Sequence, residues 1–324
     1  MENLSQLNDF ISCPTEDSII LICVFRDEEL IIDAFIKHYK SLKVSHFIFI
    51  DNGSEDYSCD ILYANMHGID YQLWRATGRY SENDYGLAWV NFILETEVRN
   101  MWCIVVDLDE FLVLEGHANL RQLVDCMNRE DKNITHTCLV DFYPRVFHGT
   151  AYVSGSPPVL HSSFYDKFEN EYIKCCGRVQ DIYFQIYGGL RKRVAYKLVK
   201  EDGPMLNKKS FFKNIFYEKC GLGPGMHFFY WKDGRKNVLS NSPNCKQFKF
   251  FGVVQALAHF KYLRSDIDQY FSLRVLRNED WNNSREYKQY LSGGLASSFY
   301  DETISQVFRS TSQLYSKTVH LLPS

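Results

Sequence analysis

The chain has 324 residues, 45% of them hydrophobic and 15% aromatic, with a formal net charge of -4. This composition supplies enough apolar side chains for a large core in one or two domains, and it excludes nucleic-acid binding driven by a general positive charge. No apolar run reaches the roughly 18 residues that a membrane-spanning helix needs. The ten cysteines are scattered without metal-site spacing, so we expect free thiols and a cytoplasmic protein, with peripheral contact at the inner face of a membrane left open.

The first hundred residues alternate between strand and helix patterns. Residues 18–25 form a continuous apolar run, which predicts a strand buried on both faces. Residues 26–42 repeat apolar side chains at spacings of three and four after an acidic first turn, which predicts a helix. The same reasoning predicts strands over 46–51, 71–76 and 102–114, and helices over 56–67 and 83–100.

This alternation with short links predicts an α/β fold with a doubly wound sheet, because crossovers between parallel strands are right-handed. Ligands of such sheets bind beyond the carboxyl ends of the strands. Three polar clusters stand at those ends: RDE at 26–28, DNGSED at 51–56 and DLDE at 107–110. We therefore expect the three clusters to meet at one rim of the sheet.

The second half of the chain is harder to interpret. A helix is predicted over 119–130, a strand over 135–147, and a further helix over 265–279 with Ser265 as its cap. The intervening residues are rich in turns and aromatic side chains. We expect a division into an N-terminal extension (1–17), a catalytic domain (18–258, with halves 18–118 and 119–258) and a C-terminal helical segment (259–324) on the same globule.

Asp107 and Asp109 are separated by one residue where a buried strand ends. Their mutual repulsion makes the empty site costly, and a divalent cation removes that cost. Oxygen ligands suit Mg²⁺ or Mn²⁺, and such a cation keeps open positions that phosphate oxygens fill. The alternative is that both residues merely begin a surface loop. Asp51, in the neighbouring cluster, is placed to accept from a base N–H or a ribose hydroxyl, with an ordinary turn as the alternative.

Residues 24–56, VFRDEELIIDAFIKHYKSLKVSHFIFIDNGSED, followed by VVDLDEFLV at 105–113, resemble the nucleotide-binding half of GT-A-fold glycosyltransferases. The chain is most similar to the bacterial family-2-like group of cell-surface polysaccharide biosynthesis. The resemblance implies a GT-A-type doubly wound mixed sheet with a Rossmann-like nucleotide-binding half, an elaborated acceptor half and C-terminal helices. Further resembling stretches follow in the same order: VDFYP at 140–144, SFYD at 163–166, YGGLRKRV at 187–194 and LAHFKYLRSDIDQYF at 257–271.

The activity implied by this resemblance is transfer of a sugar from a nucleotide-diphosphate donor, with UDP-hexose expected, to a glycan or lipid-linked acceptor with inversion. The resemblance also implies roles for individual residues. Phe25, Arg26 and Glu28 flank the base, Asp51 binds uracil or ribose, Asp107 and Asp109 hold the diphosphate through Mn²⁺ or Mg²⁺, His259 contacts the metal or diphosphate, and Lys261 neutralises the leaving group.

Two further groups of residues are candidates for catalysis. Arg191 and Arg193 follow two glycines and fit a basic loop over the diphosphate, with a solvated turn as the alternative. An inverting enzyme needs a carboxylate base near the acceptor hydroxyl. The resembling stretches offer Asp141 and Asp166, with Asp181 behind them, and the sequence does not separate the three.

Two other functions compete with the transferase. One is a catalytically inactive GT-A-like protein that binds a sugar or nucleotide, although the expected acids are all present. The other is a HAD-like phosphohydrolase, which also uses two aspartates after an apolar strand. That class places Thr or Val where this chain has Phe111, and it uses the first strand rather than the fourth. The sequence indicates no oligomeric state.

Overall fold

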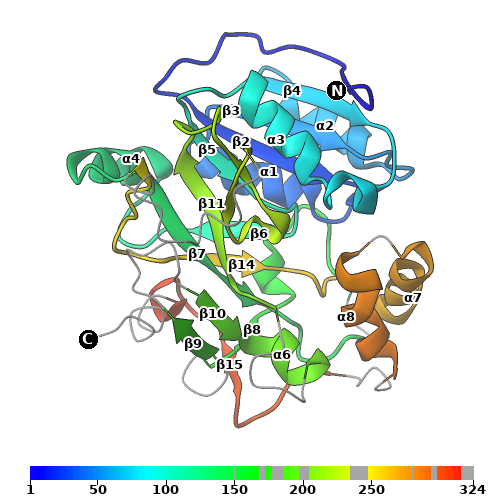
Figure 1. Ribbon diagram of the computed structural model, residues 1–324. Coiled ribbons are helices and arrows are strands. Elements are labelled where there is room, and N and C mark those ends of the chain that lie inside the picture. The colour runs from blue at the N-terminus through cyan, green and yellow to red at the C-terminus, as the bar shows by residue number, and fades with distance from the viewer. Residues whose placement is uncertain are drawn as a thin grey trace.

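The computed structural model describes residues 1–148, 151–167, 172–176, 185–196, 204–233, 247–278, 280–292 and 298–314 (Figure 1). The elements of the first part are β1 (Leu4–Gln6), β2 (Ile19–Phe25), α1 (Ile32–Ser41), β3 (His46–Asp51), α2 (Ser58–Met66), β4 (Tyr71–Ala76), η1 (Tyr80–Asn83), α3 (Leu87–Thr96) and β5 (Trp102–Val105).

The elements of the second part are β6 (Glu110–Val113), α4 (Leu120–Arg129), β7 (Ile134–Asp141), η2 (Pro158–Leu160), β8 (Phe164–Asp166), β9 (Tyr172–Cys176), β10 (Gln185–Gly188), α6 (Gly189–Ala195), β11 (Asn207–Lys213), β12 (Cys220–Leu222), η3 (Pro224–Met226), β13 (Phe229–Trp231), β14 (Gln255–His259), α7 (Ile267–Arg277), α8 (Trp281–Ser292) and β15 (Ser305–Val307).

A mixed sheet forms the centre of the molecule, and among the described residues it has the order β1-β4-β3-β2-β5-β11-β7-β14-β6. Strand β2 pairs in parallel with β3 and β5, and β3 pairs in parallel with β4. Strand β11 then runs antiparallel between β5 and β7, β14 lies parallel to β7, and β6 closes the edge antiparallel to β14. The α/β class and the parallel crossovers expected from the sequence are confirmed.

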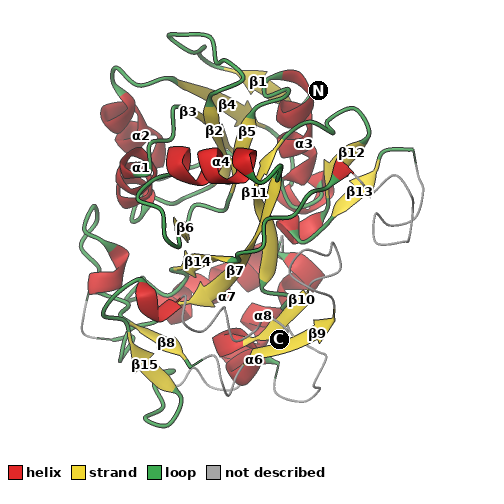
Figure 2. Ribbon diagram, turned by 90° about the vertical axis from the view of Figure 1, so that its left-hand side faces the viewer, coloured by secondary structure: helices red, strands yellow, loops and turns green. Residues whose placement is uncertain are grey.

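Helices cover both faces of the parallel part of this sheet. Leu21 and Cys23 of β2 pack in one hydrophobic cluster with Phe35 of α1, whereas Ile20 and Ile22 lie in the other cluster together with residues of α3. Alternate strand residues point to opposite faces, so an unbroken apolar strand fills both cores. Figure 2 shows α1 and α2 on one side of β2 and α3 on the other. The sheet is therefore doubly wound, as expected.

The strand expected over residues 102–114 is in fact two strands that belong to different parts of the sheet. β5 ends at Val105, and the chain turns through residues 106–109 before β6 joins the far edge beside β14. The sequence does not reveal that the two strands pair with different neighbours, because both are buried and together they read as one apolar run. The turn carries Asp107 and Asp109, and this break in the strand is what brings them to the same end of the sheet.

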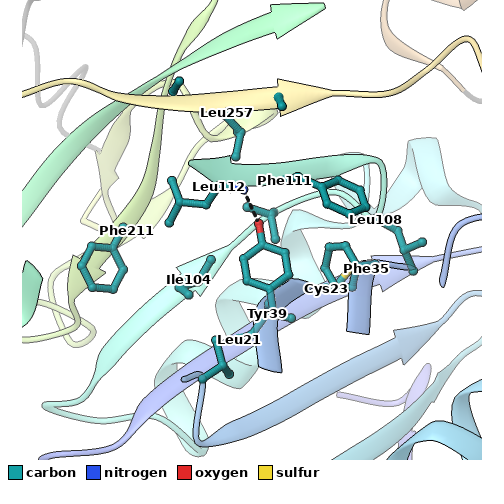
Figure 3. Packing of buried hydrophobic residues seen from close by; sticks show 14 of the residues in the cluster. Leu21, Cys23, Phe35, Tyr39, Ile104, Leu108, Phe111, Leu112, Phe211 and Leu257 are labelled. Atoms are coloured by element: carbon teal, nitrogen blue, oxygen red, sulfur yellow. Dashed lines mark hydrogen bonds between the residues drawn. The ribbon is translucent and has the colours of Figure 1, made fainter. Parts of the chain in front are cut away.

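Strand β6 is fixed to helix α1 by Tyr39. The hydroxyl of Tyr39 donates to the carbonyl oxygen of Glu110 at 2.9 Å. It also accepts from the backbone N–H of Leu112 at 3.1 Å, the bond drawn in Figure 3. The rings of Phe35 and Phe111 meet edge to face, with their centroids 5.9 Å apart. Burial raises the pKa of Tyr39, so its hydroxyl keeps the proton that it donates. Strand β6, which follows the acidic turn, is thus anchored to the core helix α1.

Several expected helices are shorter than the sequence indicated. Helix α1 begins at Ile32 rather than at residue 26. Helix α3 begins at Leu87 rather than near residue 83, because Asp84, Tyr85 and Gly86 have positive φ angles that interrupt a helix. Helix α7 begins at Ile267, and its N-cap is Asp266 rather than the expected Ser265. None of these changes moves a helix to another face of the sheet.

The expected division of the chain stays a prediction. Strand β1, within the expected extension, pairs with β4 of the central sheet, and β14 runs across the expected boundary between residues 258 and 259. Helices α7 and α8 lie together beside β14 in Figure 1. Among the described residues, no helix combines the length and the hydropathy needed to cross a bilayer.

Candidate active site

A cavity of about 760 Å³ opens beyond the carboxyl ends of β2 and β5. Strand β2 pairs with β3 on one side and with β5 on the other, so the strand order reverses at this point. That reversal is where doubly wound sheets bind their ligands. Residues after both strands line the cavity, among them Arg26, Glu28, Asp107 and Asp109. The third polar cluster contributes Asn52 to the same lining, so all three clusters meet at one rim, as expected.

His259 is the centre of the site. Its Nε2 atom lies 3.1 Å from Oδ2 of Asp109, and its Nδ1 atom lies 2.6 Å from Oδ1 of Asp141. Strand pairing sets this arrangement, because His259 of β14 is opposite Glu110 of β6 and Asp141 of β7. Burial by itself lowers the pKa of His259, but the two aspartates raise it to about 9. Both ring nitrogens therefore carry protons at neutral pH and donate to carboxylates.

Asp141 is held in place by Arg191 of α6. The Arg191 Nε atom donates to Oδ2 of Asp141 at 3.1 Å. Burial raises the pKa of Asp141, but Arg191 and His259 outweigh this and hold it well below its usual range. Asp141 does not line the cavity. Its carboxylate lies against the Nδ1 side of His259, and its expected role as a general base stays a prediction.

Asp166 and Arg193 lie away from the cavity. Asp166 is fully buried and accepts from Arg193 Nε at 2.8 Å and Nη2 at 2.9 Å, and from the hydroxyl of Tyr143 at 2.5 Å. Neither Asp166 nor Arg193 lines the cavity. This pair joins β8 to α6, and the catalytic roles expected for the two residues stay predictions. The remaining candidate, Asp181, lies outside the described residues.

Lys208 of β11 is an unexpected member of the site. Its Nζ atom lies 3.0 Å from Oδ2 of Asp107 and forms a very short contact with Oε1 of Glu110. Glu110 Oε2 accepts from the backbone N–H of Asp107 at 3.2 Å, so both oxygens of this buried carboxylate are engaged. Burial raises the pKa of Glu110, and Lys208 opposes that shift. Sequence patterns do not indicate this contact, because the two residues are 98 positions apart.

Asp109, Glu110 and His259 form the group that can hold a metal ion, since one ligand atom from each lies within 4.8 Å of the others. Two carboxylates and an imidazole suit Mn²⁺, and Mg²⁺ through the oxygens. Asp141 accepts from Nδ1 of His259 and leaves Nε2 directed toward the group. A histidine that binds a metal through one nitrogen usually donates to a carboxylate from the other. Asp107, expected as a ligand, is not part of this group and instead pairs with Lys208.

Phe25, Arg26 and Glu28 line the cavity as expected, although the ring of Phe25 packs edge to face on Phe49 in the core. Burial, reinforced by Asp109, raises the pKa of Glu28 to about 8. The Glu28 carboxylate makes no hydrogen bond to another side chain or backbone group of the described residues. It therefore stands in the cavity as an acid that is protonated near neutral pH while the site is empty.

Asp51 is not brought to the cavity. Its Oδ2 atom lies 3.0 Å from Nη2 of Arg75, and its Oδ1 atom accepts from the backbone N–H of Ser54 at 2.8 Å. The side chain is fully buried, and Asn52 lines the cavity in its place. The carboxylate of Asp51 thus stabilises the turn that follows β3.

Helices α7 and α8 form the opposite wall. Lys261 lines the cavity, donates to Glu286 at 2.7 Å and lies 4.3 Å from the centre of the Tyr287 ring. Arg274 bonds to Asp280 and lies within 6 Å of the rings of Tyr270 and Tyr287. Cationic and aromatic side chains thus face the acidic turn across the cavity.

A second cavity, of about 330 Å³, lies on the other face of β6 and β14. Phe111, Ala258 and Phe260 line it, whereas their chain neighbours Glu110 and His259 line the larger cavity. Its lining is almost wholly apolar and offers no acid, so it is not a candidate for the same chemistry.

Comparisons with known proteins give distant likenesses only. No family model matches the chain, and no curated protein does. Among solved structures, S. aureus TarS 1–349 in complex with UDP shares 9% identity over 83% of this chain and 68% of that one, with a TM-score of 0.34. UDP-glucose pyrophosphorylase complexed with UDP-glucose shares 8% over 62% and 78%, with a TM-score of 0.31.

A third structure is glucosyl-3-phosphoglycerate synthase from Mycobacterium tuberculosis, in complex with Mn²⁺, UDP and glucosyl-3-phosphoglycerate. It shares 16% identity over 39% of this chain and 44% of that one, with a TM-score of 0.24. Likeness at this level assigns neither a family nor an activity.

Proposed function

We propose that the protein is a metal-dependent glycosyltransferase that moves a sugar, with UDP-hexose as the expected donor, to a glycan or lipid-linked acceptor in surface polysaccharide biosynthesis. One observation carries the proposal. Asp109, Glu110 and His259 converge in a cavity at the reversal point of a doubly wound sheet. An oxygen-rich cation site at that position suits a nucleotide whose diphosphate completes the coordination.

A bound Mn²⁺ or Mg²⁺ stabilises the negative charge that develops on the leaving diphosphate. The protein adds fixed positive charge around the same oxygens. Arg191 lines the cavity, and its buried Nη2 atom has no hydrogen-bond partner among the described residues, while Asp141 fixes its Nε. Such an orphaned donor is costly unless a ligand oxygen accepts from it. Lys261 lies on the same wall and supplies a second cation.

The volume of about 760 Å³ is in the range of sites that enclose a nucleotide-sized ligand. We assign the base and ribose to the edge formed by Phe25, Arg26 and Asn52, and the diphosphate to the acidic turn. The sugar then lies toward α7 and α8, where Tyr270 and Tyr287 offer aromatic faces.

Inversion requires a base that removes the acceptor proton as the new glycosidic bond forms and the bond to the diphosphate breaks. Glu28 is the cavity carboxylate that is neither ion-paired nor in the metal group, so we assign this role to it. Its pKa of about 8 describes the empty site. A nearby cation favours the charged form and lowers that pKa toward the range in which Glu28 accepts a proton.

A thermal-shift screen of nucleotide sugars, with and without Mn²⁺, tests the proposal. We expect one UDP-sugar to raise the melting temperature with Mn²⁺ and to do so weakly in EDTA, because a ligand stabilises the state that binds it. Asp109→Asn should remove the effect, and Asp60→Asn on the exposed face of α2 is the control. No shift with any nucleotide sugar, or an equal shift in EDTA, contradicts the proposal.

A further inference from the structure

The acidic turn gathers several carboxylates in a small volume. Asp107, Asp109 and Glu110 fall within four consecutive residues, and Glu28 faces the same cavity. Glu110 is 1% exposed, so water does little to stabilise its charge. A buried carboxylate persists in the ionised form when a partner of opposite charge is held beside it.

Lys208 is that partner, and its position is fixed by the backbone rather than by its own flexible chain. Its strand, β11, is paired with β7 at this point, with Lys208 opposite Thr137. The register of β11 shifts between Lys208 and Phe211, so the regular pairing with β7 is interrupted just beyond Lys208 and resumes at Phe211. The Lys208 side chain is 5% exposed and reaches both Asp107 and Glu110.

Lys208 and a metal ion compete for Glu110, because both are cations beside the same carboxylate. One of its oxygens contacts the Lys208 ammonium and the other accepts from the N–H of Asp107. Glu110 is nevertheless one of the three residues whose ligand atoms lie close enough to share a cation. Each oxygen keeps a lone pair for a metal ion, but the ammonium repels a divalent cation at such short range, so binding of the metal through Glu110 favours movement of Lys208 away from the carboxylate.

We propose that Lys208 is a built-in counter-ion that competes with the divalent cation for Glu110 and moves onto the diphosphate when the donor binds. The second half of this statement rests on the function proposed above. The exchange needs no covalent step: the metal takes the carboxylate, and the ammonium finds new acceptors in the phosphate oxygens. Because each ligand then makes room for the other, metal and nucleotide bind cooperatively.

Lys208→Met separates this role from a general structural one. With Mn²⁺ alone, followed by electron paramagnetic resonance of the free ion, the variant should bind roughly tenfold more tightly than the wild type, because the competing cation is gone. Addition of UDP should then strengthen Mn²⁺ binding less in the variant than in the wild type. A lysine that serves only the fold would not increase Mn²⁺ affinity when removed.

Lys209→Met is the matched control. Lys209 is the next residue of β11 and is equally buried, but its Nζ atom lies 3.0 Å from Nδ1 of His136 and it does not line the cavity. Its removal should leave Mn²⁺ affinity unchanged. Should Lys208→Met fail to fold, Lys208→Met with Asp107→Asn removes one acid together with the lysine, and Asp107→Asn alone is its reference.

The proposal is overturned if Lys208→Met, or the double variant against its reference, binds Mn²⁺ no more tightly. This outcome is distinct from failure of the proposed function. A wild-type protein that binds Mn²⁺ but no UDP or UDP-sugar contradicts the transferase and the transfer of Lys208 to a diphosphate, whereas the comparison with Mn²⁺ alone still decides the competition for Glu110.

Discussion

Asp141 and His259 are neighbours across two parallel strands, and the Nδ1 atom of His259 lies 2.6 Å from Oδ1 of Asp141. The pairing of β7 with β14 therefore does more than extend the sheet. It fixes which nitrogen of the imidazole is occupied and which one faces Asp109. The acidic turn and the far edge of the sheet become one site through this contact.

Replacement of Asp141 by Asn should weaken metal binding without removing a ligand. The amide keeps the shape of the side chain but no longer fixes the Nδ1–H of His259 by charge, so Mn²⁺ affinity should fall by about 10- to 100-fold. Calorimetric titration with Mn²⁺ measures this. Asp166→Asn is the control, because it breaks a comparably buried aspartate pair away from the cavity and should reduce stability while Mn²⁺ affinity stays as in the wild type.

Asp51→Asn tests whether this residue binds the nucleotide. Because Asp51 pairs with Arg75 and caps its own turn, the substitution should lower the free energy of unfolding by about 1–3 kcal/mol. UDP affinity should remain within about twofold of the wild type, since less than 0.5 kcal/mol is involved. Urea unfolding and UDP titration give the two values. A large loss of UDP affinity in a fully stable variant would restore the role expected from the sequence.

Tyr39→Phe removes one hydroxyl that joins helix α1 to strand β6. It leaves the carbonyl of Glu110 and the N–H of Leu112 buried without their partner, at a cost of about 1–3 kcal/mol in stability. Because β6 carries Glu110, Mn²⁺ affinity should fall as well. Phe35→Leu, which alters packing against Phe111 but keeps the hydroxyl, distinguishes the hydrogen bonds from a general loosening of the core.

The stability of the protein should depend on pH through His38. Burial lowers the pKa of His38 to about 4, and its Nε2 donates to the carbonyl of Leu112 at 2.9 Å. Below the ordinary pKa of about 6.5 the unfolded chain takes up a proton that the folded protein refuses. The stabilisation is complete above that value and is lost as pH falls toward 4, by at most about 1.4 kcal/mol per pH unit.

A variant isolates this contribution, because Glu28 acts in the opposite sense. Its pKa is raised to about 8, so between pH 5 and 6.5 the folded protein holds a proton that the unfolded chain releases. His38→Gln keeps a donor and removes the titration. Urea unfolding between pH 5 and 6.5 should show a less positive slope of stability against pH in the variant. Identical slopes would contradict the assignment to His38.

The sequence predicted the parallel part of the sheet well because local patterns determine it. Each apolar run is followed by its own helix, and the acids at the strand ends lie where the rule for doubly wound sheets places them. This rule predicted that Asp109 and Glu28 lie at the cavity. The role of His259 was implied by the resemblance alone.

The sequence could not show which charged residues meet. Lys208 reaches Glu110 across 98 positions, and Lys261 meets Glu286 on a helix that carries no sign of the contact. Asp141 and Asp166 were candidate bases through the resemblance, and the sequence did not show that each pairs with an arginine of α6, where we expected a basic loop. Partner choice across the sheet depends on strand order, which local patterns do not specify.

Calorimetric titration of UDP into the wild-type protein, with Mn²⁺ and then with EDTA, tests the central claim most directly when it is repeated with Asp109→Asn. The account predicts UDP binding that needs Mn²⁺ and falls by at least about tenfold in Asp109→Asn, or at least 1.4 kcal/mol. UDP binding of equal strength in EDTA, or in Asp109→Asn with Mn²⁺, would contradict a metal-held diphosphate at the acidic turn.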